Sequence, residues 1–307
     1  MGTQVDILML GIGAWDYLGT VAHIPLGSKA QMIEHLEQGG GPAATAAVTA
    51  SRLGARTGFI GKVGDDARGR LIVDELRKEG VDVSGCMVQE GAISPAAFCW
   101  VEQSTGNRSV AWHQGSTTPL SPEEVPEDLV CGARVLHLDG HQAEAALVAA
   151  ELARQAGATV SLDAGRYHEY MDRLMELSHV VIASEAFGRE LIGSDDPQRA
   201  VREIFSRGSR IAMVTLGSRG SLCLTSERLL QKPAFPVAVV DTTGAGDVFH
   251  GAFCVGILEG WDVDQTIDFA SAVAALKCTR LGGRTGIPLR AEAVTFLKSV
   301  KGRQWKD

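Results

Sequence analysis

Short apolar runs alternate with helical patterns along most of this chain, and that alternation limits the fold more than any other feature. Val5–Leu10 is a nearly continuous apolar run that ends at Gly11, as expected of a strand buried on both faces. Gly39-Gly-Gly-Pro42 then opens an Ala-rich helical stretch that reaches Leu53, with Gly54 after its end. Strands that alternate with helices of this length predict a parallel sheet covered by helices on both faces.

The same alternation continues towards the C-terminal end. Further strands are expected at Arg56–Ile60, Arg134–Leu138, Ala158–Leu162, Val180–Ala183, Arg210–Leu216 and Val237–Val240. Further helices are expected at Ala67–Lys78, Ala143–Gln155, Pro197–Ser206, Gly244–Leu258, Val263–Leu276 and Arg290–Val300. Together these elements predict one three-layer α/β/α domain over residues 1–307, with a mostly parallel central sheet.

Two segments interrupt this rhythm. Residues Ala14–Gln38 and Ile93–His113 contain short β-like pieces and polar turns without a helical period. We expect both to form a small β-sheet that projects from the main domain as a lid over a site. The alternative is that both are long surface loops.

The overall charge argues against some classes of partner. The chain is 45% hydrophobic and 21% charged, as in ordinary globular proteins, and its formal net charge is −8. A net negative charge argues against nucleic acid or an anionic membrane surface as the main partner, although it leaves room for a local basic pocket.

The cysteines and the N-terminal segment predict a cytoplasmic protein. Six cysteines are scattered without a C-x-x-C pair, which favours free thiols in a reducing compartment over disulfides or a zinc site. No basic segment precedes Val5–Leu10, and no apolar run approaches the roughly 18 residues that a membrane helix needs. We therefore expect neither a signal peptide nor a membrane span.

Two glycine motifs are incomplete and carry no function. Gly11-Ile-Gly13 follows a predicted strand, but Asp16 stands where a dinucleotide-binding fingerprint has its third glycine. Gly61-Lys62 lacks both the upstream glycine and the following Ser or Thr of a Walker A loop.

A stronger feature is the string Asp241-Thr-Thr-Gly-Ala-Gly-Asp247, which lies between an expected strand and an expected helix. Glycines at the start of a helix let backbone N–H groups approach an anion closely, and the helix dipole adds favourable potential. Gly244, Ala245 and Gly246 are thus predicted to form an anion hole for a transferred phosphoryl group, with Asp247 accepting a proton from an attacking hydroxyl. The alternative is that Asp247 only complements the helix dipole.

The order of several motifs resembles the carbohydrate-kinase family that includes ribokinase and the bacterial minor phosphofructokinases, also called the PfkB family. The motifs are Asp16 after the first strand, Gly39-Gly40-Gly41, Gly61-Lys-Val-Gly-Asp-Asp66, Thr215-Leu-Gly-Ser-Arg-Gly220, the string ending at Asp247, and Thr279-Arg-Leu-Gly-Gly283. The resemblance implies a ribokinase-like domain with a β lid. It also implies transfer of the ATP γ-phosphate to a sugar hydroxyl with Mg²⁺.

The resemblance assigns roles position by position. Asp247 becomes the catalytic base and Gly244–Gly246 the anion hole, while Asp16, Gly40 and Gly41 hold sugar hydroxyls. Thr45 is a further substrate position, where it replaces the asparagine usual in ribokinases, which argues against a ribose pocket. The nucleotide positions are Ser184, Thr215, Gly217, Ser218, Gly220 and Gly246. Read without the resemblance, Thr215–Gly220 would be a glycine-rich hairpin between Val214 and Leu222.

The resemblance also implies metal ions. A K⁺ ion would order the anion hole, and the positions that match this site are Asp241, Thr243, Cys278, Gly282 and Gly286. The family's N-x-x-E motif, which helps to organise Mg²⁺, is degenerate here and reads Ser184-Glu185-Ala186-Phe187. Glu185 could take its place from a shifted position, or water could hold the metal.

Within the family, the sequence most resembles the sulfofructose kinases. Lys29 matches the lysine that those enzymes use on the sulfonate, whereas their asparagine and arginine fall near Trp112 and His141. Arg108 or Arg166 could compensate. The best match is therefore 6-deoxy-6-sulfofructose, and the alternatives are fructose, fructose 6-phosphate, ribose, 2-keto-3-deoxygluconate, a nucleoside, or a catalytically dead sensor of sugar and nucleotide. A homodimer through the lid is also implied.

Overall fold

The computed structural model describes residues 5–302, and its strands form two sheets of very different size. The large sheet has the order β13 (Leu229–Lys232), β12 (Ser221–Thr225), β11 (Ile211–Thr215), β10 (Val180–Ser184), β9 (Thr159–Ala164), β8 (Val135–Leu138), β1 (Ile7–Leu10), β4 (Thr57–Gly64), β5 (Asp82–Gln89). The strands from β11 to β5 run parallel, and β12 and β13 complete one edge antiparallel. The predicted α/β fold with a mostly parallel sheet is confirmed.

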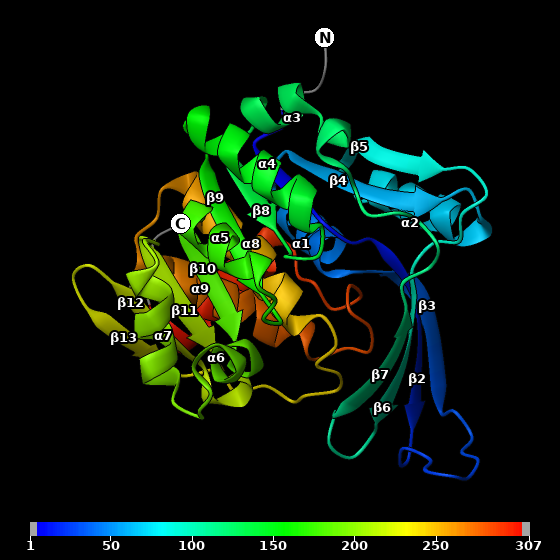
Figure 1. Ribbon diagram of the computed structural model, residues 1–307. Coiled ribbons are helices and arrows are strands. Elements are labelled where there is room, and N and C mark those ends of the chain that lie inside the picture. The colour runs from blue at the N-terminus through cyan, green and yellow to red at the C-terminus, as the bar shows by residue number, and fades with distance from the viewer. Residues whose placement is uncertain (1–4, 303–307) are drawn as a thin grey trace.

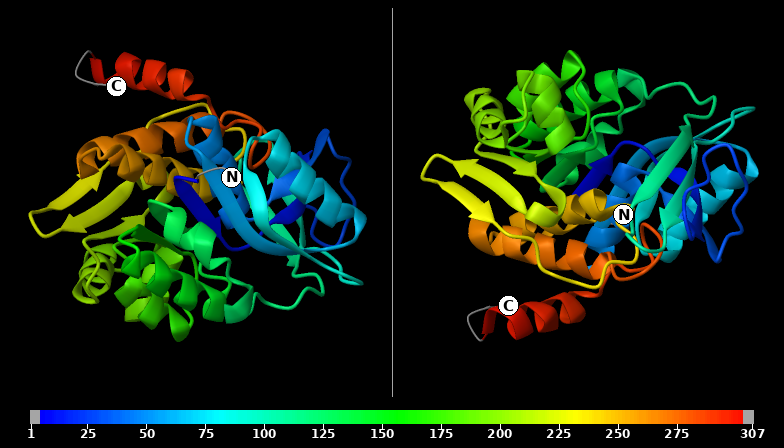
Figure 2. Two further views of the ribbon diagram at one scale, coloured as in Figure 1. Left: turned by 90° about the horizontal axis from the view of Figure 1, so that it is seen from above. Right: turned by 90° about the horizontal axis from the view of Figure 1, so that it is seen from below.

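Helices cover both faces of this sheet (Figures 1 and 2). One core layer includes residues of α1 (Pro42–Arg52), α2 (Ala67–Lys78), α8 (Ala245–Glu259), α9 (Val263–Lys277) and α10 (Arg290–Lys301). The other includes residues of α3 (Glu127–Gly132), α4 (Ala143–Gln155), α5 (Tyr170–Leu177), α6 (Glu185–Ile192) and α7 (Pro197–Ser206). Short 3₁₀ turns lie at Pro122–Glu124 and Gly217–Arg219.

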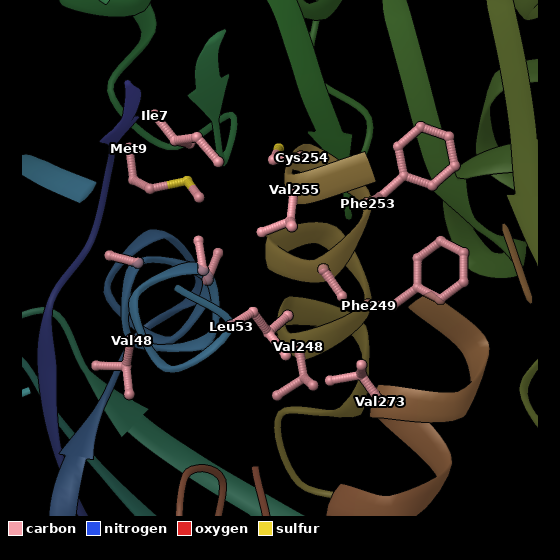
Figure 3. Close-up of a cluster of buried hydrophobic side chains, with 14 of the residues drawn as sticks. Ile7, Met9, Val48, Leu53, Val248, Phe249, Phe253, Cys254, Val255 and Val273 are labelled. Carbon is pink, nitrogen blue, oxygen red and sulfur yellow. The ribbon is translucent and has the colours of Figure 1, made fainter. Parts of the chain in front are cut away.

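Strand β1 shows why the sequence needs two helical layers. Its side chains alternate between the faces of the sheet, so Ile7 and Met9 enter the core with α1 and α8, and Leu8 and Leu10 enter the opposite core. Figure 3 shows Ile7 and Met9 pointing into the same cluster as Val48 on α1 and Val255 on α8. A strand with both faces buried must be apolar throughout, which explains its unbroken hydrophobic sequence.

The small sheet has the strand order β3 (Glu34–Gly40), β2 (Ala14–Val21), β6 (Ala96–Glu102), β7 (Arg108–His113). Its strands come from the two segments that lack a helical period, so the expected small sheet is confirmed. Figure 1 shows it projecting from one side of the large sheet.

Most predicted elements are present, with shifts of a few residues at their ends. The prediction of a strand at Val237–Val240 is wrong, because these residues join no ladder in the described chain. They follow Pro236, which lacks a backbone N–H to donate to a ladder. The N–H of Val240 instead donates to the Cys278 carbonyl (2.8 Å), which lies outside the sheet. No helix within residues 5–302 is long and apolar enough to cross a membrane.

Candidate active site

The carboxyl ends of the parallel strands meet at one edge of the large sheet, where two predicted site residues lie together with two aspartates that were not predicted. Asp139 directly follows β8, Asp163 is near the end of β9, Ser184 ends β10 and Thr215 ends β11. In open α/β sheets ligands bind at this edge. A surface hollow of about 670 Å³, lined by Arg56, is next to the starts of β4 and β5, at the opposite edge.

The N-terminus of α8 is open to a ligand. Gly244 precedes the helix with a left-handed φ of 71°, a conformation that glycine adopts without strain. Among the described residues, no side chain caps this helix end. A Cβ added to Gly246 would meet nothing within 4 Å. The predicted glycines thus leave an unobstructed helix N-terminus suited to an anion.

Asp247 is in the first turn of α8 and is half-buried. Burial raises the pKa of its carboxyl group to about 6, and the negative charges of Asp163 and Asp139 act in the same direction. His250 and Arg108 oppose this rise. A carboxylate with a pKa this close to neutrality can accept a proton and still be ionised at pH 7.

Asp163 is a site residue that the sequence analysis missed. Its Oδ1 lies 3.3 Å from Nε2 of His250, one helical turn beyond Asp247. Burial alone would raise the pKa of Asp163, but the neighbouring histidines hold it below its ordinary value. The ring of His250 lies 5.3 Å from that of His137. The available signal was an aspartate directly after a predicted strand.

Asp16 comes to this edge from the small sheet. It is only 7% exposed on β2, and a Cβ on Gly40 would lie 2.1 Å from its Oδ2, so Gly40 has no room for a side chain. Burial raises the pKa of Asp16 to about 6; Arg284 opposes this, and Asp247 adds to it. Asp16 and Asp247 therefore lie within electrostatic reach of each other, although one is on the small sheet and the other is on helix α8.

Arg284 was also missed, although it connects the small sheet to the main domain. The buried guanidinium donates to Glu75 Oε1 (3.1 Å), to the Gly40 carbonyl (2.9 Å) and to Thr45 Oγ1 (3.3 Å). Glu75 in turn accepts from the Gly39 N–H at 2.6 Å. Thr45, predicted to contact the sugar, is 2% exposed and lies behind Gly40 against this guanidinium.

Asp139 ties the loop after β1 to the start of α1. Its carboxylate accepts hydrogen bonds from the backbone N–H groups of Ile12 (2.7 Å), Ala43 (3.3 Å) and His141 (3.0 Å). A Cβ on Gly11 would lie 2.0 Å from this carboxylate, which explains the glycine. The incomplete Gly11-Ile-Gly13 motif therefore has a structural role.

The predicted nucleotide residues lie together at the ends of β10 and β11, where Ser184 pairs with Thr215. Ser184 Oγ caps α6 by accepting from the Phe187 N–H at 3.0 Å. Residues 217–220, which include Gly217, Ser218 and Gly220, form a 3₁₀ turn between β11 and β12, so the hairpin expected from the sequence alone is also present. Glu185 forms an ion pair with Arg219.

The predicted sugar-binding cations are exposed, and only one of them contacts the central loop. Arg108 on β7 donates to Thr242 Oγ1 at 2.9 Å, within the string that ends at Asp247. Lys29 lies on the surface between β2 and β3, and His141 lies at the carboxyl edge after Asp139.

The loop before α8 is fixed by the carboxylate of Asp241, which is fully buried. One oxygen accepts from both the N–H and the hydroxyl of Thr243, at 2.8 and 2.7 Å, and the other accepts from the Gly282 N–H at 2.8 Å. Across the described residues, no cluster of three or more His, Cys, Asp or Glu side chains could hold a metal.

Comparison with protein families gives a match over residues 10–290, to the pfkB family of carbohydrate kinases. The ATP-dependent ribose-1-phosphate kinase of Halopiger xanaduensis is 32% identical over 299 residues, which cover 96% of this chain and 98% of that protein. The fructokinase of Solanum tuberosum is 29% identical, with 92% of each chain covered.

Solved structures agree over nearly the full length. A candidate ribokinase from Agrobacterium tumefaciens superimposes with a TM-score of 0.89 at 28% identity, covering 98% of this chain and all of the other. The Arabidopsis thaliana ribokinase complexed with ribose and ATP gives 0.83 at 25% identity, with 96% and 99% covered.

Proposed function

We propose, from the premise that this chain belongs to the pfkB family of carbohydrate kinases, that it transfers the γ-phosphoryl group of ATP to a primary hydroxyl of a ketose-type sugar. The observation that carries this proposal is the half-buried carboxylate of Asp247 in the first turn of an uncapped helix N-terminus. The base, Asp247, and the anion site therefore lie at the same end of α8, which would bring the attacking hydroxyl and the transferred phosphoryl group together.

The proposed step has a simple balance of bonds and protons. The sugar hydroxyl gives its proton to Asp247 as its oxygen forms a bond to the γ-phosphorus, and the bond between that phosphorus and the bridging oxygen to the β-phosphate breaks. Charge on the transferred group develops beside the N–H groups of Gly244–Gly246, where helix polarity is favourable. Arg108, held at Thr242, adds positive charge on the small-sheet side.

The nucleotide would lie over the ends of β10 and β11, against Ser184, Thr215 and the turn at Gly217–Arg219. Mg²⁺ would arrive on its phosphates and neutralise part of their charge. Glu185 is the acidic side chain at this position, and its ion pair with Arg219 leaves it a role through water at most.

For the acceptor we propose an anionic sugar, with 6-deoxy-6-sulfofructose as the best match. Asp16 and the backbone at Gly40 and Gly41 would take sugar hydroxyls, and Lys29 or Arg108 would face the anionic group. The ribose-1-phosphate kinase relative favours a sugar phosphate as the second candidate. A catalytically dead sensor is not favoured, because both the base and the helix end are intact.

Replacing Asp247 by Asn should lower turnover by at least about 10²-fold, because the amide cannot accept the proton. ATP and sugar binding should change little, as measured by calorimetry. Asp74→Asn on the exposed surface of α2 is the matched control and should retain full turnover. Near-normal turnover by the Asp247 variant would eliminate the assignment of this residue as the base.

The turnover of the wild type should also depend on pH in a defined way. A pKa of about 6 means that Asp247 is ionised at pH 7 and becomes protonated as the pH falls through 6. Only the ionised form accepts a proton, so kcat/KM should fall below pH 6 by about tenfold per unit or more, since Asp16 titrates in the same range. If kcat/KM instead fell only near pH 4, in protein shown by circular dichroism to remain folded, the proposed environment of Asp247 would be contradicted.

An acceptor screen tests the substrate class directly. ATP consumption should be fastest with 6-deoxy-6-sulfofructose or a sugar phosphate, and slower with fructose, ribose, 2-keto-3-deoxygluconate and nucleosides. Lys29→Ala should raise KM about tenfold for anionic sugars only, the usual scale for one charged hydrogen bond. Lys78→Ala, which removes an exposed lysine of α2, is the control. Equal effects on neutral sugars would argue against Lys29 as the anion ligand.

We also propose a homodimer through the outer face of the small sheet. Tyr17 and Phe98 stack there with ring centroids 5.0 Å apart, on the face opposite Asp16, and Phe98 is 45% exposed. An exposed aromatic side chain such as Phe98 on a projecting sheet is typical of a protein interface.

Sedimentation should therefore give a dimer for the wild type and a monomer for Phe98→Lys, because a buried lysine charge would lose its solvation. Leu71→Lys, at an exposed leucine of α2, should remain dimeric. A monomeric wild type at micromolar concentration would rule out this interface.

The cysteines support a further proposal, that the protein works in the reducing cytoplasm. All six are free thiols, and burial raises the pKa of Cys99, Cys223 and Cys254 to about 12. Such thiols are protonated and unreactive at neutral pH, which is consistent with cysteines that stay reduced. Cell fractionation would test this location, and recovery outside the cytoplasmic fraction would contradict it.

A further inference from the structure

Lys277, the last residue of α9, is completely buried against the loop that leads into α8. Lysine is almost never fully buried without a partner for its charge. Lys62, which is also buried, is paired with the carboxylate of Glu124 at 2.6 Å. Lys277 instead donates from Nζ to the backbone carbonyl of Asp241, at 2.9 Å. A backbone carbonyl as acceptor is the arrangement expected where a cation stabilises the conformation of a loop.

The groups expected to hold K⁺ here are already engaged. The Asp241 carboxylate accepts three hydrogen bonds from Thr243 and Gly282, so both of its oxygens have donors. The Cys278 carbonyl accepts the N–H groups of Val240 and Asp241, at 2.8 and 3.2 Å. Gly286 is so close to the Lys277 backbone that a Cβ there would lie 2.3 Å from its carbonyl oxygen. These residues fit a buried ammonium better than a K⁺ ion.

We propose that the ammonium group of Lys277 takes the place of a monovalent cation at the loop Asp241–Gly244, so that the protein binds no activating K⁺ there. Ammonium and K⁺ are both monovalent cations, and both prefer carbonyl and carboxylate oxygens at similar distances. Because the lysine is covalently attached, the loop would keep its cation at any salt composition.

The charges around Lys277 support a structural cation. Its Nζ lies against the Asp241 carbonyl, and the carboxylates of Asp241 and Asp247 are close enough to attract the ammonium group. Lys277 also ends α9, where the helix dipole favours a positive charge. On the other side of the loop, Arg108 donates to Thr242. Two cationic side chains therefore hold the segment that precedes the anion hole.

Melting temperatures provide a test that does not require turnover. The wild type, without substrates, should melt at the same temperature in potassium chloride and in choline chloride, because a protein that binds no K⁺ gains no stability from it. Calorimetric titration of K⁺ should show no binding. A higher melting temperature in K⁺, or measurable K⁺ binding by the wild type, would overturn the proposal even if Lys277 variants failed to fold.

Two substitutions separate the loss of the cation from the loss of packing. Lys277→Met keeps much of the volume without the charge and should lower kcat by about tenfold or more, with no rescue by K⁺. Lys277→Ser leaves space for an ion, so K⁺ should raise its melting temperature and restore part of kcat. Lys78→Met, at an exposed lysine, should behave as the wild type. Full turnover by Lys277→Met in choline chloride would overturn the proposal.

The turnover readouts rest on the proposed kinase function, whereas the melting and titration readouts do not. If neither the wild type nor any variant phosphorylates a sugar, the kinase proposal fails and the cation proposal is still decided by the effect of K⁺ on the wild type and on Lys277→Ser. If turnover is found but depends on K⁺ in the wild type, the kinase proposal stands and the cation proposal fails.

Discussion

The buried carboxylate of Asp241 determines where the catalytic end of α8 lies. Two of its three hydrogen bonds come from Thr243 within the Asp241–Asp247 string, and the third comes from the N–H of Gly282, so this carboxylate connects the string to the loop after α9. Hydrogen bonds to a charged group contribute about 1.5–3 kcal/mol each, and a buried carboxylate that lost them would be strongly destabilising. Gly244, the open helix end and Asp247 follow directly after the segment that these bonds fix.

A second buried charge connects the small sheet to that centre. Arg284 follows Gly282 and Gly283 in the chain, and its guanidinium bonds the Gly40 carbonyl and Glu75. Breaking a buried ion pair by removing one partner costs about 3–5 kcal/mol. The segment from Gly282 to Arg284 therefore contacts Asp241 at one end and the glycine turn beside Asp16 at the other. The segment before α8 and the glycines beside Asp16 are therefore held by the same short loop, which fixes the small sheet relative to the start of α8.

The sequence predicted well what is encoded locally. Helices α2, α4 and α7 have the predicted bounds, because their ends carry glycine, proline or capping side chains and their interiors have a clear period. It missed α5 and α6, which have only eight residues each and too few turns to show a period. Val237–Val240 was predicted as a strand from its valines, but pairing depends on neighbours that composition does not reveal.

Site residues within one contiguous motif were predicted, and those that depend on contacts between distant parts of the chain were missed. Asp247 and its glycines form one contiguous string, so the sequence alone indicated them. Asp139 and Arg284 act on partners 127 and 244 positions away in the chain, and a single sequence carries no sign of such contacts. Lys277 was visible only as part of a helix, and its burial against Asp241 is a property of the packed α8 and α9 pair.

The coupling between Asp16 and Asp247 has a consequence for acceptor binding under the proposed function. The negative charge of Asp247, on α8, contributes to the raised pKa of Asp16 on the small sheet. Two ionised carboxylates repel each other, and a sugar that donates one hydroxyl hydrogen to each would offset that repulsion. Such a sugar would draw the small sheet towards α8, whereas a ligand without paired hydroxyl donors would not. Asp16 and Asp247 would then both recognise the paired hydroxyl groups of the acceptor and position it for transfer. Lys29 or Arg108 would bind its anionic end separately.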